Sequence, residues 1–236
     1  MSLLIEKIKE LAKKNTLEVI GNRHHLHQNP ELSYHEVETQ AYVLAQLNSM
    51  GIQAERIANT GLVAKIEGKN PTKRVIALRA DMDALPIFEA NKVPYKSQRE
   101  GVMHACGHDM HVTSLIGTAR QMVKIKDQWQ GTLMLVGQPA EEFVGGAQSM
   151  RDDKIWQRFG TPDYAMALHV SSEIEAGKIV AVEGSPYSGV DSVDIHIHGV
   201  GAHGASPHRG KDPIVLGSQI VLALQTIVSR EVAPKE

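Results

Sequence analysis

The sequence predicts an α/β fold with a mostly parallel central sheet and helices on both faces, and three observations lead to this expectation. Short segments rich in β-branched or apolar residues alternate along the chain with longer segments of helical periodicity. The chain has 236 residues, which is long enough to bury a sizeable core. Apolar residues make up 42% of it and charged residues 22%, as is typical of a globular protein.

Helices are expected at the N-terminus and again before residue 51. Residues 1–20 are amphipathic, with apolar side chains at helical spacing among lysines and glutamates, namely Leu4, Ile8 and Leu11. Ser33 is followed three positions later by Glu36, which is the spacing of a capping box. We therefore expect a helix to begin there and to stop at Gly51, a residue that suits a helix C-terminus.

Four strands and one further helix are expected in the middle of the chain. Residues 62–66 (LVAKI) and 74–80 (RVIALRA) are short and rich in β-branched residues. Residues 109–125 have helical periodicity after a glycine. Residues 131–139 (GTLMLVGQP) form a nearly continuous apolar run that ends in proline, which predicts a strand buried on both faces, and 163–170 (DYAMALHV) predict another.

The character of the sequence changes near residues 185–189, and a second, smaller domain is expected to begin there. Residues 190–200 (VDSVDIHIHGV) alternate between apolar and polar side chains, the pattern of a strand with one face in water. A helix is expected from about Pro213 to Ser229. We therefore predict domains at 1–186 and 187–236, and we expect the sequence to be part of a longer one, because it ends without the strands that would complete the second domain.

Composition argues against several partners. A formal net charge of −2 and a pI near 6.6 give no electrostatic reason to bind nucleic acid or an anionic membrane. No apolar run is expected to approach the roughly 20 residues of a membrane span. Cys106 is the single cysteine, which excludes an internal disulfide framework and predicts a cytoplasmic location.

Candidate chemical groups lie at the ends of four apolar strands or in the loops beyond them, where open α/β sheets bind ligands. They are Asp81 with Asp83, Cys106 with His108, Glu141 with Glu142, and His169. A thiolate next to an imidazole suits zinc, manganese, cobalt or nickel. Adjacent carboxylates point in different directions, so that one can bind a metal while the other carries protons.

Each of these groups also has a purely structural interpretation. The two aspartates could cap a loop, and a buried cysteine is more often inert than a ligand. The convergence of all four groups on one sheet favours a functional site. By contrast, the HIH sequence at 196–198 lies in the predicted one-faced strand and favours a polar sheet face, while His104 and His111 flank the ligands and are hypothesised to orient them. Four further histidines cluster near the start of the chain, and most of them are expected to be structural: His24, His25, His27 and His35.

Six ordered motifs resemble those of the M20 metallopeptidase family, specifically its amidohydrolase branch. That branch includes N-acyl-amino-acid amidohydrolases, hippurate hydrolases and auxin-conjugate hydrolases. The motifs cover the chain from Arg23 onward and are RHHLHQNPELSYHEVET, LRADMDALP, MHACGHDMHV, GQPAEE, ALHV and GVGAHGASPHRGKDPI. The resemblance implies a zinc-peptidase-like catalytic domain followed by a smaller α+β lid domain through which two subunits form a homodimer.

The resemblance also implies roles for individual residues. Two divalent metal ions, zinc or manganese with cobalt and nickel as alternatives, would be bound by Cys106, His108, Glu142 and His169. Cys106 would bridge the ions. Glu141 corresponds to the general base, Asp83 to the aspartate that supports a metal-bound group, and His203 to a lid histidine that holds the substrate's carbonyl oxygen across the dimer. Asp81 stands where other branches carry a metal-binding histidine.

These correspondences predict metal-dependent hydrolysis of the amide bond in small N-acyl amino acids. A dipeptidase or aminopeptidase of the same family, and a non-catalytic binding protein on the same scaffold, are the alternatives. The family pattern contains a last metal-binding histidine near its carboxyl end, and this sequence ends before that position.

Overall fold

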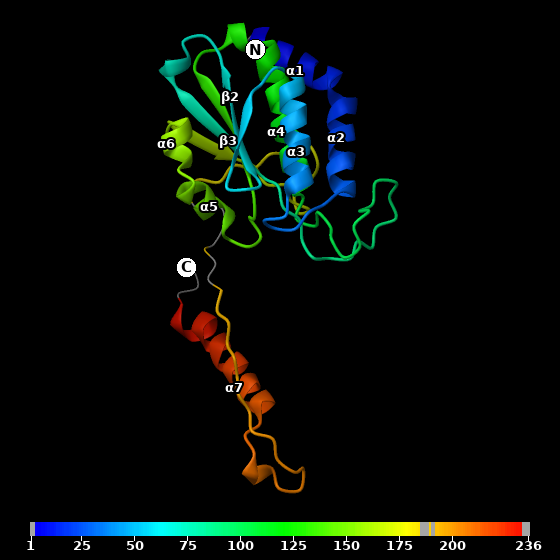
Figure 1. Cartoon of the computed structure of the whole chain (residues 1–236), viewed down its shortest axis with the longest axis vertical. Helices are drawn as coiled ribbons and strands as arrows, with labels where there is room; N and C mark the ends of the chain where they lie inside the picture. Colours follow the sequence, from blue (N-terminus) through cyan, green and yellow to red (C-terminus); the bar gives the residue numbers. More distant parts are fainter. Residues whose placement is uncertain (1–2, 185–188, 190–191, 233–236) are drawn as a thin grey trace. The chain divides into compact units, whose positions relative to one another are not determined.

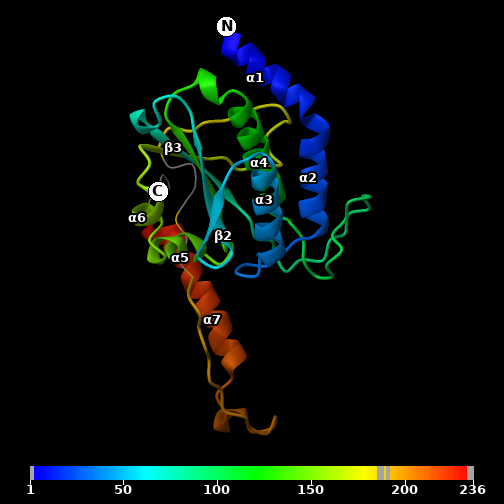
Figure 2. The same ribbon diagram turned by 45° about the horizontal axis from the view of Figure 1, so that its top comes forward.

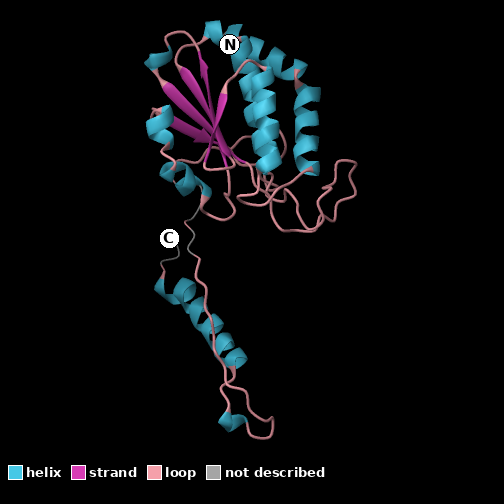
Figure 3. Ribbon diagram, in the orientation of Figure 1, coloured by secondary structure: helices cyan, strands magenta, loops and turns pink. Residues whose placement is uncertain are grey.

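The computed structural model describes residues 3–184, 189 and 192–232, and the chain divides into two compact units, Met1–Ala176 and Gly177–Glu236. Figure 1 shows the course of the chain, and Figure 3 distinguishes its helices from its strands. The predicted domain boundary between residues 186 and 187 lies outside the described residues.

A five-stranded mixed sheet forms the centre of the first unit. Its strands are β1 (Ala54–Ile57), β2 (Gly61–Glu67), β3 (Val75–Asp81), β4 (Thr132–Gln138) and β5 (Tyr164–Ala167), in the order β1-β2-β4-β3-β5. β3 pairs in parallel with both β4 and β5, while β2 is antiparallel to β1 and β4. Only β2 therefore runs against the common direction, and the α/β class with a mostly parallel sheet is confirmed.

Helices cover both faces of this sheet, as Figures 1 and 2 show. One face packs against α2 (Thr16–Gln28), α3 (Val37–Ser49) and α4 (His108–Lys124), with α1 (Leu3–Lys14) preceding α2 along the chain. The other face packs against α5 (Gly146–Asp152) and α6 (Ile155–Phe159). Two short 3-10 helices, η1 (Pro71–Lys73) and η2 (Lys126–Gln128), complete the described elements of this unit.

The alternation of side chains along the inner strands divides the core between the two faces. Leu133 and Leu135 of β4 join the cluster under α2, α3 and α4, while Met134 and Val136 join the cluster under α5 and α6. β4 is thus buried on both faces, as its apolar run predicts. β5 pairs on one side only, and its Tyr164–Ala167 side chains are exposed, so the prediction of a second buried strand is wrong for this element.

The predicted capping box at the start of α3 is also wrong. Ser33 Oγ donates to Asp83 Oδ2 at 2.7 Å, and the side chain of Glu36 makes no hydrogen bond to the helix that it precedes. Glu31 caps the helix instead, because its carboxylate accepts from the backbone amides of Glu38 at 3.2 Å and Thr39 at 2.7 Å. The spacing is that of a capping box, but long-range partners compete successfully for both side chains.

The second unit contains η3 (Pro207–Arg209), α7 (Pro213–Thr226) and a π-helical turn, η4 (Ile227–Glu231). The Asp212 side chain caps α7 by accepting from Ile214 N at 2.8 Å. The strand expected over 190–200 is not formed in the described part of that range, where only Val200 bridges to Lys211. A strand needs a ladder of such bridges, and among the described residues of this segment Val200 alone forms one.

One helix of the described chain, Pro213–Glu231, is long and apolar enough to cross a membrane by length and composition alone. The expectation that no apolar run approaches that length is therefore too strong. The finding is weak evidence for a span, because core helices of proteins in water pass the same test.

Candidate metal centre

The candidate site lies where three parallel strands end and α4 begins. β3 ends at Asp81, β4 at Gln138 and β5 at Ala167. The predicted ligands of the first unit lie in the loops that follow or, in the case of His108, at the start of α4. Parallel strands deliver their carboxyl ends to the same edge of a sheet, which is why segments far apart in sequence meet here.

His108, the first residue of α4, is the centre of the cluster and is fully buried. Its Nδ1 lies 2.9 Å from the carbonyl oxygen of Asp83 and 3.2 Å from Asp83 Oδ1. We assign the ring proton to Nδ1, which donates to Asp83, so that the Nε2 lone pair is available to a ligand. Gly107 precedes it with φ of 89°, and an added Cβ there would meet Val170 Cγ2 at 2.4 Å, so glycine is required at this position.

Three carboxylates surround the Nε2 atom of His108. The distances are 3.6 Å to Asp81 Oδ2, 3.8 Å to Glu141 Oε2 and 3.9 Å to Glu142 Oε1. Both His108 Nε2 and Glu142 Oε1 are buried atoms without a hydrogen-bond partner. Buried polar atoms are rarely left unpaired, and these two atoms, 3.9 Å apart, fit the ligands of a bound cation.

Cys106 and His169 complete this side of the cluster. The Cys106 Sγ atom lies 3.3 Å from His169 Nε2, and His169 Nδ1 donates to the carbonyl oxygen of Val170 at 2.6 Å. Three groups of candidate ligands occur, in each of which the ligand atoms lie within 4.8 Å of one another, and all three groups include His108. They are Cys106–His108–His169, Asp81–His108–His111 and His108–Glu141–Glu142.

The electrostatics of the cluster favour a bound cation. Burial and the negative charges of Glu142 and Glu141 raise the pKa of the Cys106 thiol to about 12. Burial also raises the pKa of Glu141. A divalent cation would reverse this balance by stabilising a thiolate and neighbouring carboxylates together. The donor set of sulfur, imidazole and carboxylate therefore fits a transition-metal or zinc site.

Both ring nitrogens of His111 are engaged in hydrogen bonds, one to Asp81 and one to the backbone next to His169. Its Nδ1 lies 2.6 Å from Asp81 Oδ1, and its Nε2 accepts from Val170 N at 3.0 Å. Burial alone would raise the pKa of Asp81, but the hydrogen bond from His111 and the charge of Arg79 outweigh it and hold the pKa at about 2. These contacts agree with the hypothesis that His111 orients the ligands.

His104 has no comparable contacts. It is buried, neither ring nitrogen has a hydrogen-bond partner among the described residues, and burial lowers its pKa to about 4. No hydrogen bond among the described residues therefore supports the hypothesis that His104 orients a ligand.

Asp83, in the loop after β3, connects the segment between α2 and α3, the loop after β4 and the first residue of α4. It accepts from Ser33 Oγ at 2.7 Å and from the backbone amide of Glu142 at 2.9 Å, and it receives His108 Nδ1 as described above. Burial alone would raise the pKa of Asp83, but these hydrogen bonds, His108 first, lower it. Asp83 thus stays ionised and fixes the ring of His108 and the backbone that carries Glu142.

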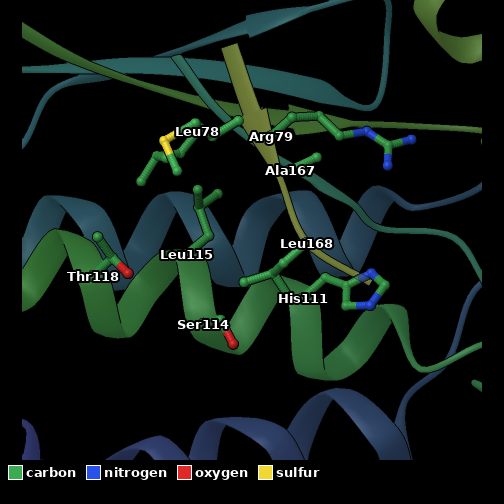
Figure 4. A pocket seen from close by; sticks show the side chains of 9 residues that line it. Leu78, Arg79, His111, Ser114, Leu115, Thr118, Ala167 and Leu168 are labelled. Atoms are coloured by element: carbon green, nitrogen blue, oxygen red, sulfur yellow. The ribbon is translucent and has the colours of Figure 1, made fainter. Parts of the chain in front are cut away.

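A pocket lies beside this cluster, between α4 and the ends of β3 and β5 (Figure 4). His111 and Arg79 are among its lining residues, and the remaining lining is mostly apolar. The other lining residues are Leu78, Ser114, Leu115, Thr118, Met166, Ala167 and Leu168. The pocket offers no further metal ligand and lies next to the site rather than within it.

The predicted residues of the second unit are not collected into a ligand group. His203 is exposed, and its Nδ1 accepts from Ala205 N at 3.1 Å within its own loop. His196 and His198 are exposed on the extended segment, and no group of candidate ligands in the described chain includes them. The HIH sequence is thus not part of a metal site in the described residues.

Sequence reasoning missed a second buried polar cluster directly behind His108. Asp109 Oδ2 receives His27 Nδ1 at 2.7 Å and Arg23 Nε at 3.0 Å, and His27 Nε2 lies 3.2 Å from Glu89 Oε1. His27 and Asp109 are 82 residues apart, so no local spacing reveals this contact. The only available signal was the density of charged and imidazole groups near Arg23.

These features define an α/β protein with a candidate metal centre at the carboxyl edge of its parallel strands. Residues 77–234 match the family model described as "Peptidase family M20/M25/M40", and the chain belongs to this family.

Individual relatives agree with this assignment. The chain is 42% identical over 233 residues to the N-acyl-L-amino acid amidohydrolase of Geobacillus stearothermophilus, covering 98% of this chain and 62% of the relative. It is 41% identical over 235 residues to thermostable carboxypeptidase 2 of Saccharolobus solfataricus, covering 98% and 59%. A solved structure from Bacillus subtilis, described as a dinuclear metal-binding peptidase of family M20, is similar with a TM-score of 0.64 and 35% identity, covering 72% of this chain and 46% of that one. The chain thus spans less than two thirds of each of these proteins.

Proposed function

We propose that this protein is a metal-dependent amidohydrolase that cleaves the amide bond of N-acyl amino acids. The observation that carries the proposal is the convergence of Cys106, His108 and His169 with two glutamates around unpaired, buried ligand atoms. The relative named N-acyl-L-amino acid amidohydrolase supports the choice of substrate class.

Cys106, His108, Glu142 and His169 are the proposed ligands of two divalent ions, zinc or manganese with cobalt and nickel as alternatives. When bound, such ions lower the pKa of a water molecule toward 7 and polarise a carbonyl group. The solved relative described as a dinuclear metal-binding peptidase supports the number of ions.

The two glutamates are assigned different tasks because their surroundings differ. Glu142 has a buried carboxylate oxygen without a partner and a side chain that is 22% exposed, which suits a ligand. The Glu141 side chain is 41% exposed, and burial raises its pKa, which suits a group that exchanges protons with water and substrate. In the proposed reaction Glu141 takes a proton from the attacking water and returns it to the departing amine.

Two further residues assist in this proposal. Asp83 holds His108 Nδ1 and the Glu142 backbone, so that both ligands keep their orientation. His203 of the second unit is proposed to donate to the substrate's carbonyl oxygen from the partner of a homodimer. Cys106 is a free thiol, and a cysteine that binds a metal must be one. Because thiols stay reduced in the cytoplasm, this role supports a cytoplasmic location.

The test is the substitution Glu141→Gln, with Glu142→Gln as the matched variant. E141Q is expected to lower kcat for N-acetyl amino acids by about 10² to 10⁴ while the metal content stays at the wild-type level. E142Q is expected to lose metal as well. Undiminished turnover by E141Q would remove Glu141 from its role, and absence of hydrolysis by the metal-loaded wild type would favour a non-catalytic binding protein.

A peptidase is the second candidate, because a relative of similar identity is named a carboxypeptidase. Rates on N-acetyl amino acids and on dipeptides with a free amino group separate the two. Faster cleavage of the unblocked dipeptides would favour the peptidase.

A further inference from the structure

The segment Glu31–Glu36 (ELSYHE), between α2 and α3, contacts both loops that carry the proposed carboxylates. The carbonyl oxygen of Glu31 accepts from Ala84 N at 2.7 Å, next to Asp83. Ser33 donates to Asp83 itself. Glu36, at the other end of the segment, contacts the loop that follows β4.

Glu36 is a fully buried carboxylate with two long-range partners. Its Oε1 atom accepts from the backbone amide of Ala140 at 2.7 Å, across 104 residues of sequence, and its Oε2 atom accepts from Thr60 Oγ1 at 2.6 Å. A buried carboxylate is costly unless such donors satisfy it. Neither bond belongs to α3, so capping does not explain the presence of this residue.

Ala140 has a backbone conformation that needs support from its surroundings. Its φ of 46° lies in the left-handed region, which is unfavourable for residues other than glycine. Its carbonyl oxygen accepts from the amides of Gly146 at 3.0 Å and Gly145 at 3.4 Å. A Cβ at Gly146 would meet the Pro139 carbonyl oxygen at 1.6 Å, so the chain closes tightly on itself at this turn.

Glu141 and Glu142 lie inside this closed turn. The glycine amides fix the carbonyl side of Ala140, and Glu36 fixes its amide side. The direction in which the chain leaves Ala140 sets where both glutamate side chains begin, and both reach within 3.9 Å of His108 Nε2. Strained backbone of this kind persists where the surroundings over-determine it, and it is common beside functional groups.

We propose that Glu36 is a positioning residue for the Glu141–Glu142 pair, acting through the backbone of Ala140. The inference rests on the proposed roles of these glutamates as base and ligand. Glu36 touches neither of them and orients them by holding the turn from which they project.

Glu36→Ala tests this inference, with Glu31→Ala as the matched control. Glu31 is a buried glutamate of the same segment. Its carboxylate also accepts hydrogen bonds from backbone amides, but those amides belong to the first turn of α3. In the metal-free protein, amide hydrogen exchange over residues 140–146 is expected to accelerate at least about tenfold in E36A and to stay at the wild-type rate in E31A. This measurement needs neither metal nor substrate, so its outcome is separate from that of the proposed function.

With metal, E36A is expected to weaken Co²⁺ binding by about 10- to 100-fold and to change the visible absorption of bound Co²⁺. The kcat for an N-acetyl amino acid is expected to fall by about 10²-fold while KM stays within about twofold. E31A is expected to lower the midpoint of thermal unfolding but to keep the wild-type Co²⁺ affinity and spectrum. Failure of the wild type to bind Co²⁺ would overturn the proposed function and, with it, the role assigned to Glu36.

The conservative substitution Glu36→Gln separates the effect of the hydrogen bonds made by Glu36 from the effect of its negative charge. A glutamine amide oxygen can still accept from Ala140 N while its amide group donates to Thr60, so E36Q is expected to keep Co²⁺ affinity within about threefold of wild type. If E36A fails to fold, Glu36→Asp, which shortens the reach by one methylene, replaces it in both measurements. Wild-type exchange rates, Co²⁺ affinity and spectrum in E36A, or in E36D where E36A does not fold, would overturn the proposal.

Discussion

Two regions of the first unit depart from ordinary burial in opposite ways. At the carboxyl ends of β3 and β4, charged and polar side chains are buried, with Asp83 and His108 almost inaccessible to solvent. Along β5 and at the residue that follows it, apolar side chains are exposed, with Met166 at 60% and Leu168 at 55%. Buried polar groups are costly unless they are paired, whereas exposed apolar groups cost little until they gather into patches. The first region is therefore held by specific partners, whereas the second contributes little to the stability of the described chain.

The cluster behind His108 shows how the first region is held. Asp109 is fully buried and receives both His27 and Arg23, while Glu89 receives the far side of the His27 ring. These contacts join α2, the loop before α4 and the first turn of α4. Asp109, the residue after His108, is therefore anchored by a buried charged network.

The largest expected effect is that of Asp109→Ala. Removing this carboxylate leaves both His27 and Arg23 without their buried negative partner. We therefore expect the free energy of unfolding to fall by about 3 to 5 kcal/mol. Urea unfolding of the metal-free protein measures it. The control is Asp152→Ala, which removes an exposed aspartate bonded to Gln148 Nε2 at 2.6 Å and is expected to cost within about 0.5 kcal/mol. If the two variants lost similar amounts of unfolding free energy, the buried network would not stabilise the fold as argued.

A pair of methionines in the same sheet tests the comparison directly. Met134 of β4 is 0% exposed and Met166 of β5 is 60% exposed. Met134→Ala is expected to cost about 2 to 5 kcal/mol, because it leaves a cavity in a packed core. Met166→Ala is expected to cost within about 0.5 kcal/mol. Thermal and urea unfolding measure both, and a cost for M166A as large as that for M134A would mean that β5 is covered in solution.

The sequence predicts the strands and the ligand pairs better than it predicts their partners. Cys106 with His108, and Glu141 with Glu142, are close in sequence, and the rule that parallel strands end at one edge brings the pairs together. The residues that hold them come from far away, as with Glu36 and Ala140, which are 104 positions apart. Spacing alone carries no information about such contacts.

Two errors have physical causes of the same kind. Ser33 and Glu36 have capping-box spacing, but each side chain gains a buried long-range partner instead, and tertiary contacts outweigh a local preference. The apolar run of β5 shows only that this strand can be buried. Whether other protein covers it depends on neighbours that the local pattern does not encode.

The smallest expected effect is a change of stability with pH that originates at His27. The hydrogen bond to Asp109 raises the pKa of His27, outweighing burial, with Glu89 adding to the rise and Arg23 opposing it. A group whose pKa is raised by folding stabilises the folded state fully below its unfolded pKa of about 6.5 and loses that contribution as the pH rises through the folded value. The difference in unfolding free energy between wild type and His27→Gln should therefore be largest near pH 6 and shrink at higher pH, by at most about 1.4 kcal/mol per pH unit. Urea unfolding in a chelator from about pH 5.5 to about pH 9 avoids both metal binding and the titration of ordinary carboxylates. A difference that stays constant or grows with pH would show that His27 is held in the neutral form, and that the buried region is stabilised by neutral hydrogen bonds rather than by charge.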